Sequence, residues 1–315
     1  MSNRPHDHPA ARSAGEVPRT LARRPWRRGA ALALALGVAL TGCGGTSSQG
    51  ASTTPPASGP SSGAAVAKGP SSIAGKGKLV ACVDPTVPPM EFFGENDSKN
   101  PIGFDIDMIN EVAKSWGVTP QIKVSEFTGL LPALAGGTCD VVWSAIFMLP
   151  ERLQGEFDAV AYLNSGPVIL VAGGNPAKIS SPDDLSGKTV AVQSGTNFPG
   201  MLADLNKELT AAGKAPAKVQ EYSGANDAAQ QVIIGRAQAF LALDADGSAR
   251  VQDTEHDWEI GYTYPKELQY GVFHLKADKE LGEALDAEIK RLVQDGTMKS
   301  ALEKWKLPTD GMIDL

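Results

Sequence analysis

Short apolar runs alternate with amphipathic stretches from Lys76 onward, and this alternation predicts an α/β architecture. The apolar run at 79–83 is typical of a buried strand. A helix is expected next, because Asp105 can cap its first turn, apolar residues recur on one face up to Trp116, and Gly117 can adopt the left-handed conformation that ends helices. The elements that complete a β-α-β-α-β unit are a strand at 122–124, a short helix at 130–135 and a strand at 140–145.

The same order of elements is repeated further along the chain. The second unit consists of a strand at 189–192, a helix at 201–209, a strand at 218–222, a helix at 225–234 and a strand at 240–243. Two extended runs, 168–172 and 270–274, have no helix between them and their neighbours, and we expect them to cross between two lobes. Two further helices, with apolar faces at 281–292 and 302–305, end the chain. Two lobes joined by two crossings form a cleft that can open and close.

The N-terminal 42 residues have the pattern of a signal peptide. Arginines precede an uncharged stretch, 29–40, which is shorter than the about 20 apolar residues that span a membrane. The sequence Leu-Thr-Gly-Cys at 40–43 resembles a bacterial lipobox, so we expect Cys43 to be acylated and to begin the mature chain. The alternative is a soluble precursor cut nearby, with Cys43 left as an unmodified thiol. Arginine pairs leave a twin-arginine export route open beside the general one.

A tether of low complexity follows the cysteine. Residues 44–67 carry no charge and consist mainly of Gly, Ser, Thr, Ala and Pro, a composition that cannot bury enough apolar surface to offset chain entropy. We therefore expect 43–75 to be the lipidated cysteine and a flexible linker. Lobe 1 is then expected to contain 76–168 and 272–315, and lobe 2 to contain 169–271.

Charge excludes one class of partner. The formal net charge is −7, and the seven arginines of the signal peptide outnumber its two carboxylates by five. Without that segment the charge is −12, so the mature chain should repel nucleic acid and anionic lipid surfaces. A hydrophobic content of 42% is enough for one large or two medium cores.

Motifs spread over 76–306 resemble the family 3 extracytoplasmic solute-binding proteins, which serve ABC importers of amino acids. The segments that carry the resemblance are 79–92, 103–107, 129–134, 150–152, 183–196, 235–236, 243–244 and 295–299. The resemblance implies a periplasmic-binding-protein type 2 fold, in which each lobe is a mostly parallel sheet flanked by helices. It also implies a lipoprotein on the outer face of the cell membrane that acts as a monomer without a cofactor. Such a protein delivers an amino acid or related zwitterion to a permease whose ATPase is a separate subunit.

The resemblance assigns roles to several residues. Arg152 matches the arginine that binds the ligand carboxylate, although it could instead be an exposed residue of a first helical turn. Asp244 matches the aspartate that binds the ligand ammonium, although it could cap a helix that begins near Asp246. Gly195 and Thr196 open a strand-to-helix turn whose free N–H groups favour an anion, unless the turn is a plain connection. Asp84, Ser144 and Ala145, at the carboxyl ends of strands, complete the expected head-group site.

Other positions depart from the family pattern. Val87 stands where an aromatic residue usually stacks on the ligand, and Phe147 replaces a hydroxyl residue. Phe127 keeps an aromatic wall position, and Asn197 replaces a threonine. We therefore expect a pocket more apolar, or shaped differently, than one for a strongly charged amino acid. Trp143 could also reach the site, although a core position is favoured.

Two cysteines remain after Cys43, in what should be an oxidising compartment. If the strands that carry Cys82 and Cys139 are parallel neighbours, aligning Asp84 with Ser144 separates the cysteines by about 10 Å, whereas a disulfide needs Cα atoms within about 7 Å. This reasoning favours two buried thiols and leaves a Cys82–Cys139 disulfide as the alternative. The histidines of the mature chain have no partners at metal-ligand spacing, so no metal site is expected.

Two other functions remain open. Cyclohexadienyl dehydratases resemble the same family, and Asp84, Glu91 or Glu151 could serve such an enzyme as acid or base. A sensory lipoprotein would present its ligand to a receptor rather than to a permease. We expect a binding protein rather than an enzyme. Fold alone does not decide among these functions, because function resides in the site. The pair Arg152 and Asp244 favours a zwitterion as the ligand.

Substitution of Cys43 tests the predicted lipobox. Cys43→Ser should move the protein from the membrane pellet to the soluble fraction, because no thiol remains to be acylated. Fractionation followed by immunoblotting measures the shift. Continued sedimentation of the variant with membranes would contradict the lipobox.

Overall fold

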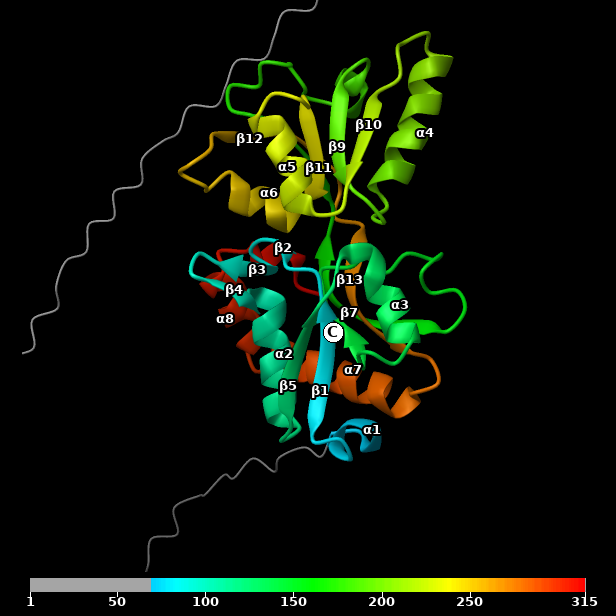
Figure 1. Cartoon of the computed structure of the whole chain (residues 1–315), viewed down its shortest axis with the longest axis vertical. Coiled ribbons are helices and arrows are strands. Elements are labelled where there is room, and N and C mark those ends of the chain that lie inside the picture. Colours follow the sequence, from blue (N-terminus) through cyan, green and yellow to red (C-terminus); the bar gives the residue numbers. More distant parts are fainter. Residues whose placement is uncertain (1–68, 315) are drawn as a thin grey trace, which may run out of the picture. The chain divides into compact units, whose positions relative to one another are not determined.

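Two five-stranded sheets, each flanked by helices, form the core of the described part of the chain, residues 69–314 of a computed structural model (Figure 1). These residues belong to one compact unit. The predicted signal peptide, the lipobox with Cys43 and most of the predicted linker lie outside the described residues. No helix within 69–314 has the length and apolar character needed to cross a membrane.

Lobe 1 is built on the sheet with strand order β5-β1-β6-β13-β7. Its strands are β1 (Lys78–Val83), β5 (Thr119–Val124), β6 (Val141–Val142), β7 (Phe157–Ser165) and β13 (Leu268–Leu275). Its helices are α1 (Ser71–Ala74), α2 (Phe104–Ser115), α3 (Leu130–Ala135), α7 (Lys279–Gln294) and α8 (Thr297–Lys304), with short 3-10 turns η1 (Phe127–Gly129) and η3 (Thr309–Gly311). A small antiparallel sheet adds β2 (Thr86–Val87), β3 (Glu91–Gly94) and β4 (Asp97–Ile102).

Lobe 2 is built on the sheet with strand order β10-β9-β11-β8-β12. Its elements are β8 (Pro167–Ala172), η2 (Pro182–Leu185), β9 (Thr189–Gln193), α4 (Phe198–Ala211), β10 (Lys218–Tyr222), α5 (Ala225–Ile233), β11 (Ala239–Leu243), α6 (Asp244–Arg250) and β12 (Trp258–Thr263). In both sheets four strands run in the same direction, and one strand, β13 in lobe 1 and β8 in lobe 2, runs antiparallel between two of them. The repeated order of elements predicted from the hydrophobic pattern is therefore confirmed.

The chain crosses between the lobes in two short segments. It passes from β7 to β8 through Gly166, and it returns from β12 to β13 through 264–267. A Cβ atom on Gly166 would overlap the carbonyl of Pro265, so the two crossings lie against each other. The runs predicted to cross, 168–172 and 270–274, lie instead inside the sheets, where they pair with β12 and β7. The hydrophobic pattern did not predict β7 or β12, and the sheets consequently divide a few residues away from the expected lobe limits.

Helix α2 forms where the apolar spacing predicts it, but Asp105 does not cap it. The N-cap residue is Gly103, whose φ of 137° brings its backbone against the carbonyl of Met90. Asp105 is fully buried, and its Oδ2 accepts hydrogen bonds from the Ala145 N–H at 2.8 Å and the Tyr162 hydroxyl at 2.9 Å. The expectation of a cap was wrong because tertiary donors take this carboxylate. Gly117, with a φ of 66°, ends the helix as predicted.

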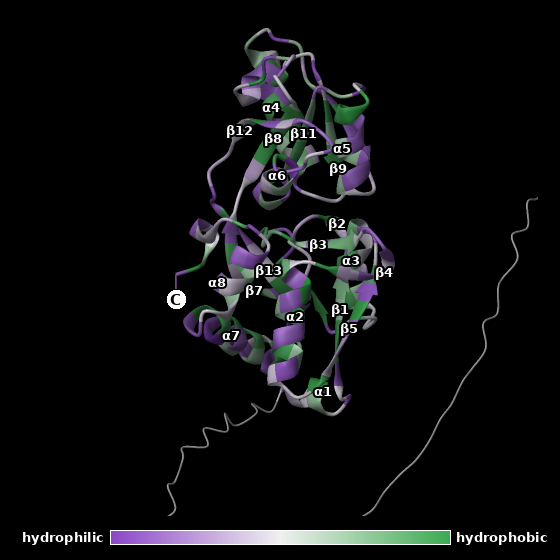
Figure 2. Ribbon diagram, turned by 90° about the vertical axis from the view of Figure 1, so that its left-hand side faces the viewer, coloured by the Kyte–Doolittle hydropathy of each residue, from purple (hydrophilic) through white to green (hydrophobic). Residues whose placement is uncertain are grey.

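Hydropathy follows the layers of each lobe. Figure 2 shows hydrophilic residues on the visible faces of α2, α4 and α7, while the strands beside them are more hydrophobic. The face of α7 that carries Leu281, Leu285, Ile289 and Leu292 is buried in the core. These helices therefore owe their position to one apolar face each.

Cys82 and Cys139 form a disulfide, with Cα atoms 5.7 Å apart. The expected strand register is correct, because Cys82 pairs with Val142 in the parallel ladder. The favoured pair of free thiols was nevertheless wrong, since β6 begins only at Val141. Cys139 lies before that strand, in a segment that folds back on β1 through Asp140, whose N–H donates to the Val80 carbonyl at 2.8 Å.

Removal of this disulfide should lower the free energy of unfolding. The cysteines are 57 residues apart, and opening a loop of this size costs about 2–4 kcal/mol of stability through the entropy of the unfolded chain. Urea unfolding of Cys82→Ala/Cys139→Ala, in a Cys43→Ser background, measures the loss. Two thiols titrating in the unreduced, unfolded Cys43→Ser protein would contradict the disulfide.

Candidate functional site

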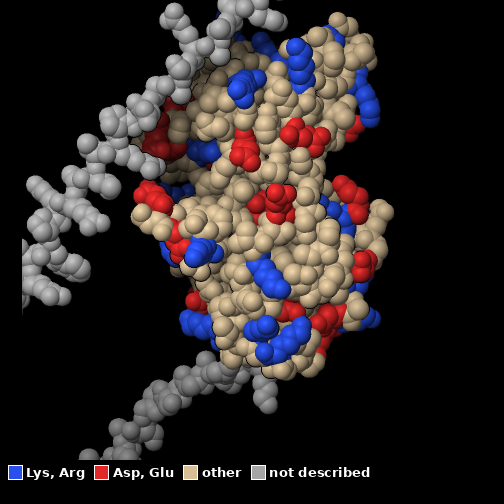
Figure 3. All heavy atoms as spheres, in the orientation of Figure 1, with Lys and Arg blue, Asp and Glu red and all other residues tan. Residues whose placement is uncertain are grey.

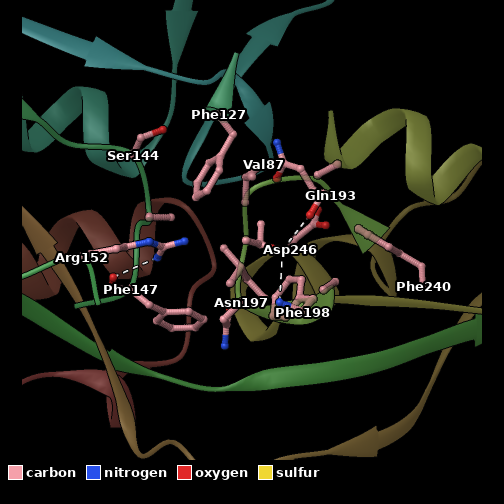
Figure 4. A pocket seen from close by; sticks show the side chains of 15 residues that line it. Val87, Phe127, Ser144, Phe147, Arg152, Gln193, Asn197, Phe198, Phe240 and Asp246 are labelled. Atoms are coloured by element: carbon pink, nitrogen blue, oxygen red, sulfur yellow. Dashed lines mark hydrogen bonds between the residues drawn. The ribbon is translucent and has the colours of Figure 1, made fainter. Parts of the chain in front are cut away.

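A small cavity lies between the two lobes (Figure 4). Lobe 1 contributes Val87, Phe127, Ser144, Ala145, Phe147 and Arg152. Lobe 2 contributes Gln193, Thr196, Asn197, Phe198, Ala225, Phe240, Ala242, Leu243 and Asp246. Among the lining residues, Ser144 follows β6, Gln193 ends β9 and Leu243 ends β11. The cavity therefore lies at the carboxyl ends of parallel strands in both sheets.

The cavity brings together eight of the eleven residues expected to bind ligand. These eight are Val87, Phe127, Ser144, Ala145, Phe147, Arg152, Thr196 and Asn197. Asp84, Gly195 and Asp244 are not among the lining residues. Trp143 is fully buried in the core, where its ring lies 5.6 Å from that of Tyr162.

Arg152 connects the lobes at the edge of the cavity. Its Nη1 donates to the Phe147 carbonyl at 3.0 Å, and its Nη2 donates to the Gly195 carbonyl, on lobe 2, also at 3.0 Å. The guanidinium lies 5.5 Å from the ring centre of Phe127. Burial lowers the pKa of the guanidinium to about 10, against the opposing charge of Glu151, so Arg152 stays cationic at neutral pH. No carboxylate within 69–314 lies at ion-pair distance from it.

Four phenylalanines, Phe127, Phe147, Phe198 and Phe240, contribute to the cavity wall. In Figure 4, Arg152, Phe127 and Phe147 lie on one side of the cavity, and Asp246 and Phe240 lie on the other. The Phe147 ring stacks on Tyr270, with ring centres 5.0 Å apart and planes 20° apart. This stacking fixes a large apolar side chain at a position where the family usually has a hydroxyl residue. The cavity is therefore suited to a ligand that combines a charged group with an apolar body.

Seven lining residues were not predicted from the sequence: Gln193, Phe198, Ala225, Phe240, Ala242, Leu243 and Asp246. Gln193 and Leu243 end predicted strands, and the rule that ligands bind at the carboxyl ends of strands would have found both. The apolar members have the spacing of ordinary core residues, so no local signal distinguishes them. Asp246 is separated by two positions from Asp244, and only the fold shows which of the two faces the cavity.

The chain is similar in sequence and fold to known proteins. A family model for bacterial extracellular solute-binding proteins, family 3, matches residues 79–308. The chain belongs to this family. The L-cystine-binding protein TcyJ of Escherichia coli is 27% identical over 230 residues, which cover 73% of this chain and 83% of that protein. The arginine-binding protein ArgT of Corynebacterium glutamicum is 28% identical over 247 residues, which cover 78% and 79%.

Structures of amino-acid-binding proteins confirm the two-lobed fold of periplasmic binding proteins of type 2. An ancestral arginine-binding protein bound to arginine is 31% identical, with a TM-score of 0.66 and coverage of 73% of this chain and 98% of that one. The ancestral amino acid-binding protein AncCDT-1, a precursor of cyclohexadienyl dehydratase, is 28% identical, with a TM-score of 0.65 and coverage of 74% and 97%. The family and these structures identify the chain as a solute-binding protein related to amino-acid-binding proteins.

Three buried carboxyl groups lie beneath the cavity of this family member. Asp84, on lobe 1, forms a hydrogen bond across the cleft: the Gln193 amide of lobe 2 donates to its Oδ2. Burial raises the pKa of Asp84 to about 6, against the hydrogen bonds from Gln193 and Thr86, which lower it. The Ser144 hydroxyl, which lines the cavity, accepts from the Asp84 N–H and donates to Glu91 Oε1, both at 2.9 Å.

Glu91 and Asp105 are placed to share a proton at the base of this network. Both are completely buried, and without a proton Glu91 Oε2 and Asp105 Oδ1 find no donor within 69–314. A hydrogen bond between the two carboxyl groups satisfies both oxygens when Glu91 is protonated. Burial, followed by the charge of Asp105, raises the pKa of Glu91 well above its usual value. The network can hold a proton, but none of its three carboxyl groups lines the cavity.

A metal centre is not indicated in this part of the chain. Within 69–314, no group of three or more His, Cys, Asp or Glu side chains is placed to hold a metal ion. The arrangement is suited to binding an anion at Arg152 and an apolar body against the phenylalanines.

The shared proton has a measurable pH dependence. In the unfolded chain Glu91 loses its proton above about pH 4, whereas in the folded chain it keeps the proton up to its raised pKa. The free energy of unfolding therefore falls as pH rises through this range. Glu91→Gln keeps a donor for Asp105 and does not titrate. Its stability relative to wild type should therefore increase between pH 5 and pH 8, as measured by urea unfolding.

The exposed Glu95 supplies the control for this experiment. Glu95→Gln should follow the pH dependence of wild type. Parallel curves for Glu91→Gln and wild type would contradict the shared proton.

Proposed function

We propose that this solute-binding protein captures an amino acid or related zwitterion in the cavity and delivers it to an ABC permease with a separate ATPase. The observation that carries the proposal is Arg152, a half-buried cation at the cavity wall whose hydrogen-bond partners are neutral carbonyls. A partly desolvated guanidinium without an anionic partner is unfavourable, and a ligand carboxylate can accept two charge-assisted bonds from it. The same ligand would then contact both lobes and stabilise the closed cleft.

The proposed ligand has an apolar or weakly polar side chain. Named relatives bind cystine and arginine, and ancestral arginine-binding proteins have been solved with arginine and with glutamine. In this chain Val87, Phe147 and Phe240 form the wall, and the buried carboxylate Asp246 is the negative charge among the lining residues. We therefore expect L-leucine, L-phenylalanine or a similar zwitterion to bind better than L-glutamate.

The proposed setting is the outer face of the cell membrane, where the acylated Cys43 would hold a monomeric binding protein through its linker. The family description, which names extracellular proteins, agrees with a location outside the cytoplasm. Nucleic acid is an unlikely partner on charge grounds, since Figure 3 shows basic and acidic side chains intermixed on the visible face. If the protein had a sensory role, deletion of its gene would leave uptake of the ligand intact. If it delivers the ligand to a permease, deletion should abolish uptake.

Catalysis of the dehydratase type is not favoured by the site. Of the three carboxylates considered as acid or base, Asp84 and Glu91 are buried beneath the cavity, and Glu151 is exposed and outside its lining. A proton donor must come within hydrogen-bond reach of the reacting group. Prephenate should therefore not be consumed by the purified protein, and its consumption would overturn the binding role.

A thermal-shift screen followed by calorimetry tests the proposal. The common L-amino acids, their amides, betaines and ectoines are compared, and a ligand at 100 times its Kd adds about 2.7 kcal/mol to stability, which raises Tm by several degrees. Arg152→Ala should weaken the binding free energy of the best ligand by about 2–5 kcal/mol, because the ligand carboxylate loses its partner.

Two controls define the role of the guanidinium. Arg236→Ala, at an exposed arginine, should leave the affinity unchanged. The amide of the ligand, which has no free carboxylate, should show little difference between Arg152→Ala and wild type. Affinity of Arg152→Ala within twofold of wild type for the free amino acid would contradict the assignment.

A further inference from the structure

The first turn of α5, in lobe 2, lies against the small sheet of lobe 1. Figures 1 and 2 show β2 at the edge of lobe 1 that faces α5, and the two elements are in contact. Thr86, the first residue of β2, packs on Gly224, because a Cβ atom on this glycine would lie 3.3 Å from the Thr86 methyl carbon. Gly224 and Ala225 are both buried. A side chain of lobe 1 therefore covers the beginning of a helix of lobe 2.

The N-cap position of α5 is Gly224, which has no side chain to cap the helix. The first N–H groups of a helix need a partner outside the helix, because no helical carbonyl precedes them. In most helices a Ser, Thr, Asp or Asn at the N-cap supplies such a partner. In α5 the Ala225 N–H donates to the Thr86 hydroxyl at 3.3 Å. The cap is thus supplied from the opposite lobe.

The Thr86 hydroxyl is oriented by its own lobe. It donates to Asp84 Oδ2 at 3.0 Å, so its lone pairs remain available to donors from lobe 2. Gln193 is a second such donor, because its side-chain amide donates to the Thr86 hydroxyl at 3.5 Å and to the Ser223 carbonyl at 3.2 Å. The bond to Asp84 lies within lobe 1 and does not depend on the cleft, whereas the contact with α5 requires the two lobes to meet.

Thr86 lies beside the ligand cavity without lining it. Its neighbour Val87 and its partner Ala225 both belong to the cavity wall, whereas Thr86 does not. Capping by Thr86 therefore holds the first turn of α5 at the place where Ala225 completes the wall. An interaction that forms only in the closed state stabilises that state whatever the ligand is.

We infer that Thr86 is a positioning residue for ligand capture, whose hydroxyl caps α5 across the cleft and stabilises the closed state without touching the ligand. The inference rests on the proposed function and adds to it a residue that sets affinity but not selectivity. Opening of the cleft would expose the Ala225 N–H to water, so closure gains the net free energy of one hydrogen bond. This gain corresponds to a change in affinity of about three- to tenfold.

Thr86→Val tests the cap, because valine has the shape of threonine without the hydroxyl. Calorimetry on the intact purified chain compares L-leucine, L-phenylalanine, L-glutamine and L-arginine. Each of these that binds the wild type should bind Thr86→Val about three- to tenfold more weakly, and the loss should be the same for all of them within about twofold. A loss that differs between two ligands by more than about twofold would show that Thr86 contacts the ligand, and it would overturn the inference.

Two controls accompany this variant. Thr86→Ser keeps the hydroxyl and should bind each ligand within about twofold of wild type. Thr119→Val makes the same chemical change at an exposed threonine, the first residue of β5, and should also bind like wild type. Affinity of Thr86→Val within about twofold of wild type, or Thr86→Ser as weak as Thr86→Val, would overturn the inference. If Thr86→Val does not fold, Thr86→Ala removes the same hydroxyl and is compared with Thr86→Ser in the same way.

Hydrogen exchange separates the inference from the proposed function. Exchange of the Ala225 amide, measured by NMR on the intact chain, should be faster in Thr86→Val than in Thr86→Ser, because only serine keeps the acceptor. If no amino acid of the four or of the thermal-shift screen binds the wild type, the proposed function fails and takes the role in ligand capture with it. Equal exchange in the two variants would then overturn the cap as well. If an amino acid binds wild type and Thr86→Val equally, only the inference is overturned.

Discussion

The half-buried guanidinium of Arg152 is the interaction on which the proposed ligand site depends. It donates to one carbonyl on each lobe, Phe147 and Gly195, and so connects the two halves of the cavity through neutral partners alone. Neutral acceptors satisfy its geometry but not its charge. This combination favours an anion beside Arg152, next to the rings of Phe127 and Phe147.

The carboxyl groups around the cavity are stabilised in different ways. Asp244 is paired with Lys266 and Asp246 with Arg250, whereas burial raises the pKa of Glu91, beneath the cavity, well above its usual value. Each solution follows from how much water and which donors reach the group. Ser144 and Gln193 line the cavity and also bind the carboxyl groups beneath it: the Ser144 hydroxyl donates to Glu91, and the Gln193 amide donates to Asp84. The Asp84 N–H donates to the same hydroxyl, so the buried carboxyl groups and the cavity wall form one hydrogen-bond network.

Several features of this solute-binding protein could be read from its residues because they depend on short-range patterns. The helix at 130–135 and the strand at 218–222 have the predicted bounds, since periodicity and flanking turn residues specify them locally. Arg152 was found through a motif directly after Pro150, and the apolar character of the pocket was expected from Val87 and Phe147. The parallel register of β1 with β6 followed from aligning two strand ends.

Other features were decided only by tertiary structure. The strands β7 and β12 are recognisable by their partners β13 and β8, because mixed burial along them leaves no clear alternation. Cys139 reaches Cys82 because the chain folds back before β6, which no strand pattern predicts. Asp244 pairs with Lys266, a residue 20 or more positions away, because the crossing segment brings the two side chains together. The sequence by itself determined the family, most of the elements and the position of Arg152, since these depend on local spacing. The three-dimensional fold decided which carboxylate lines the cavity, since that depends on how distant segments pack around it.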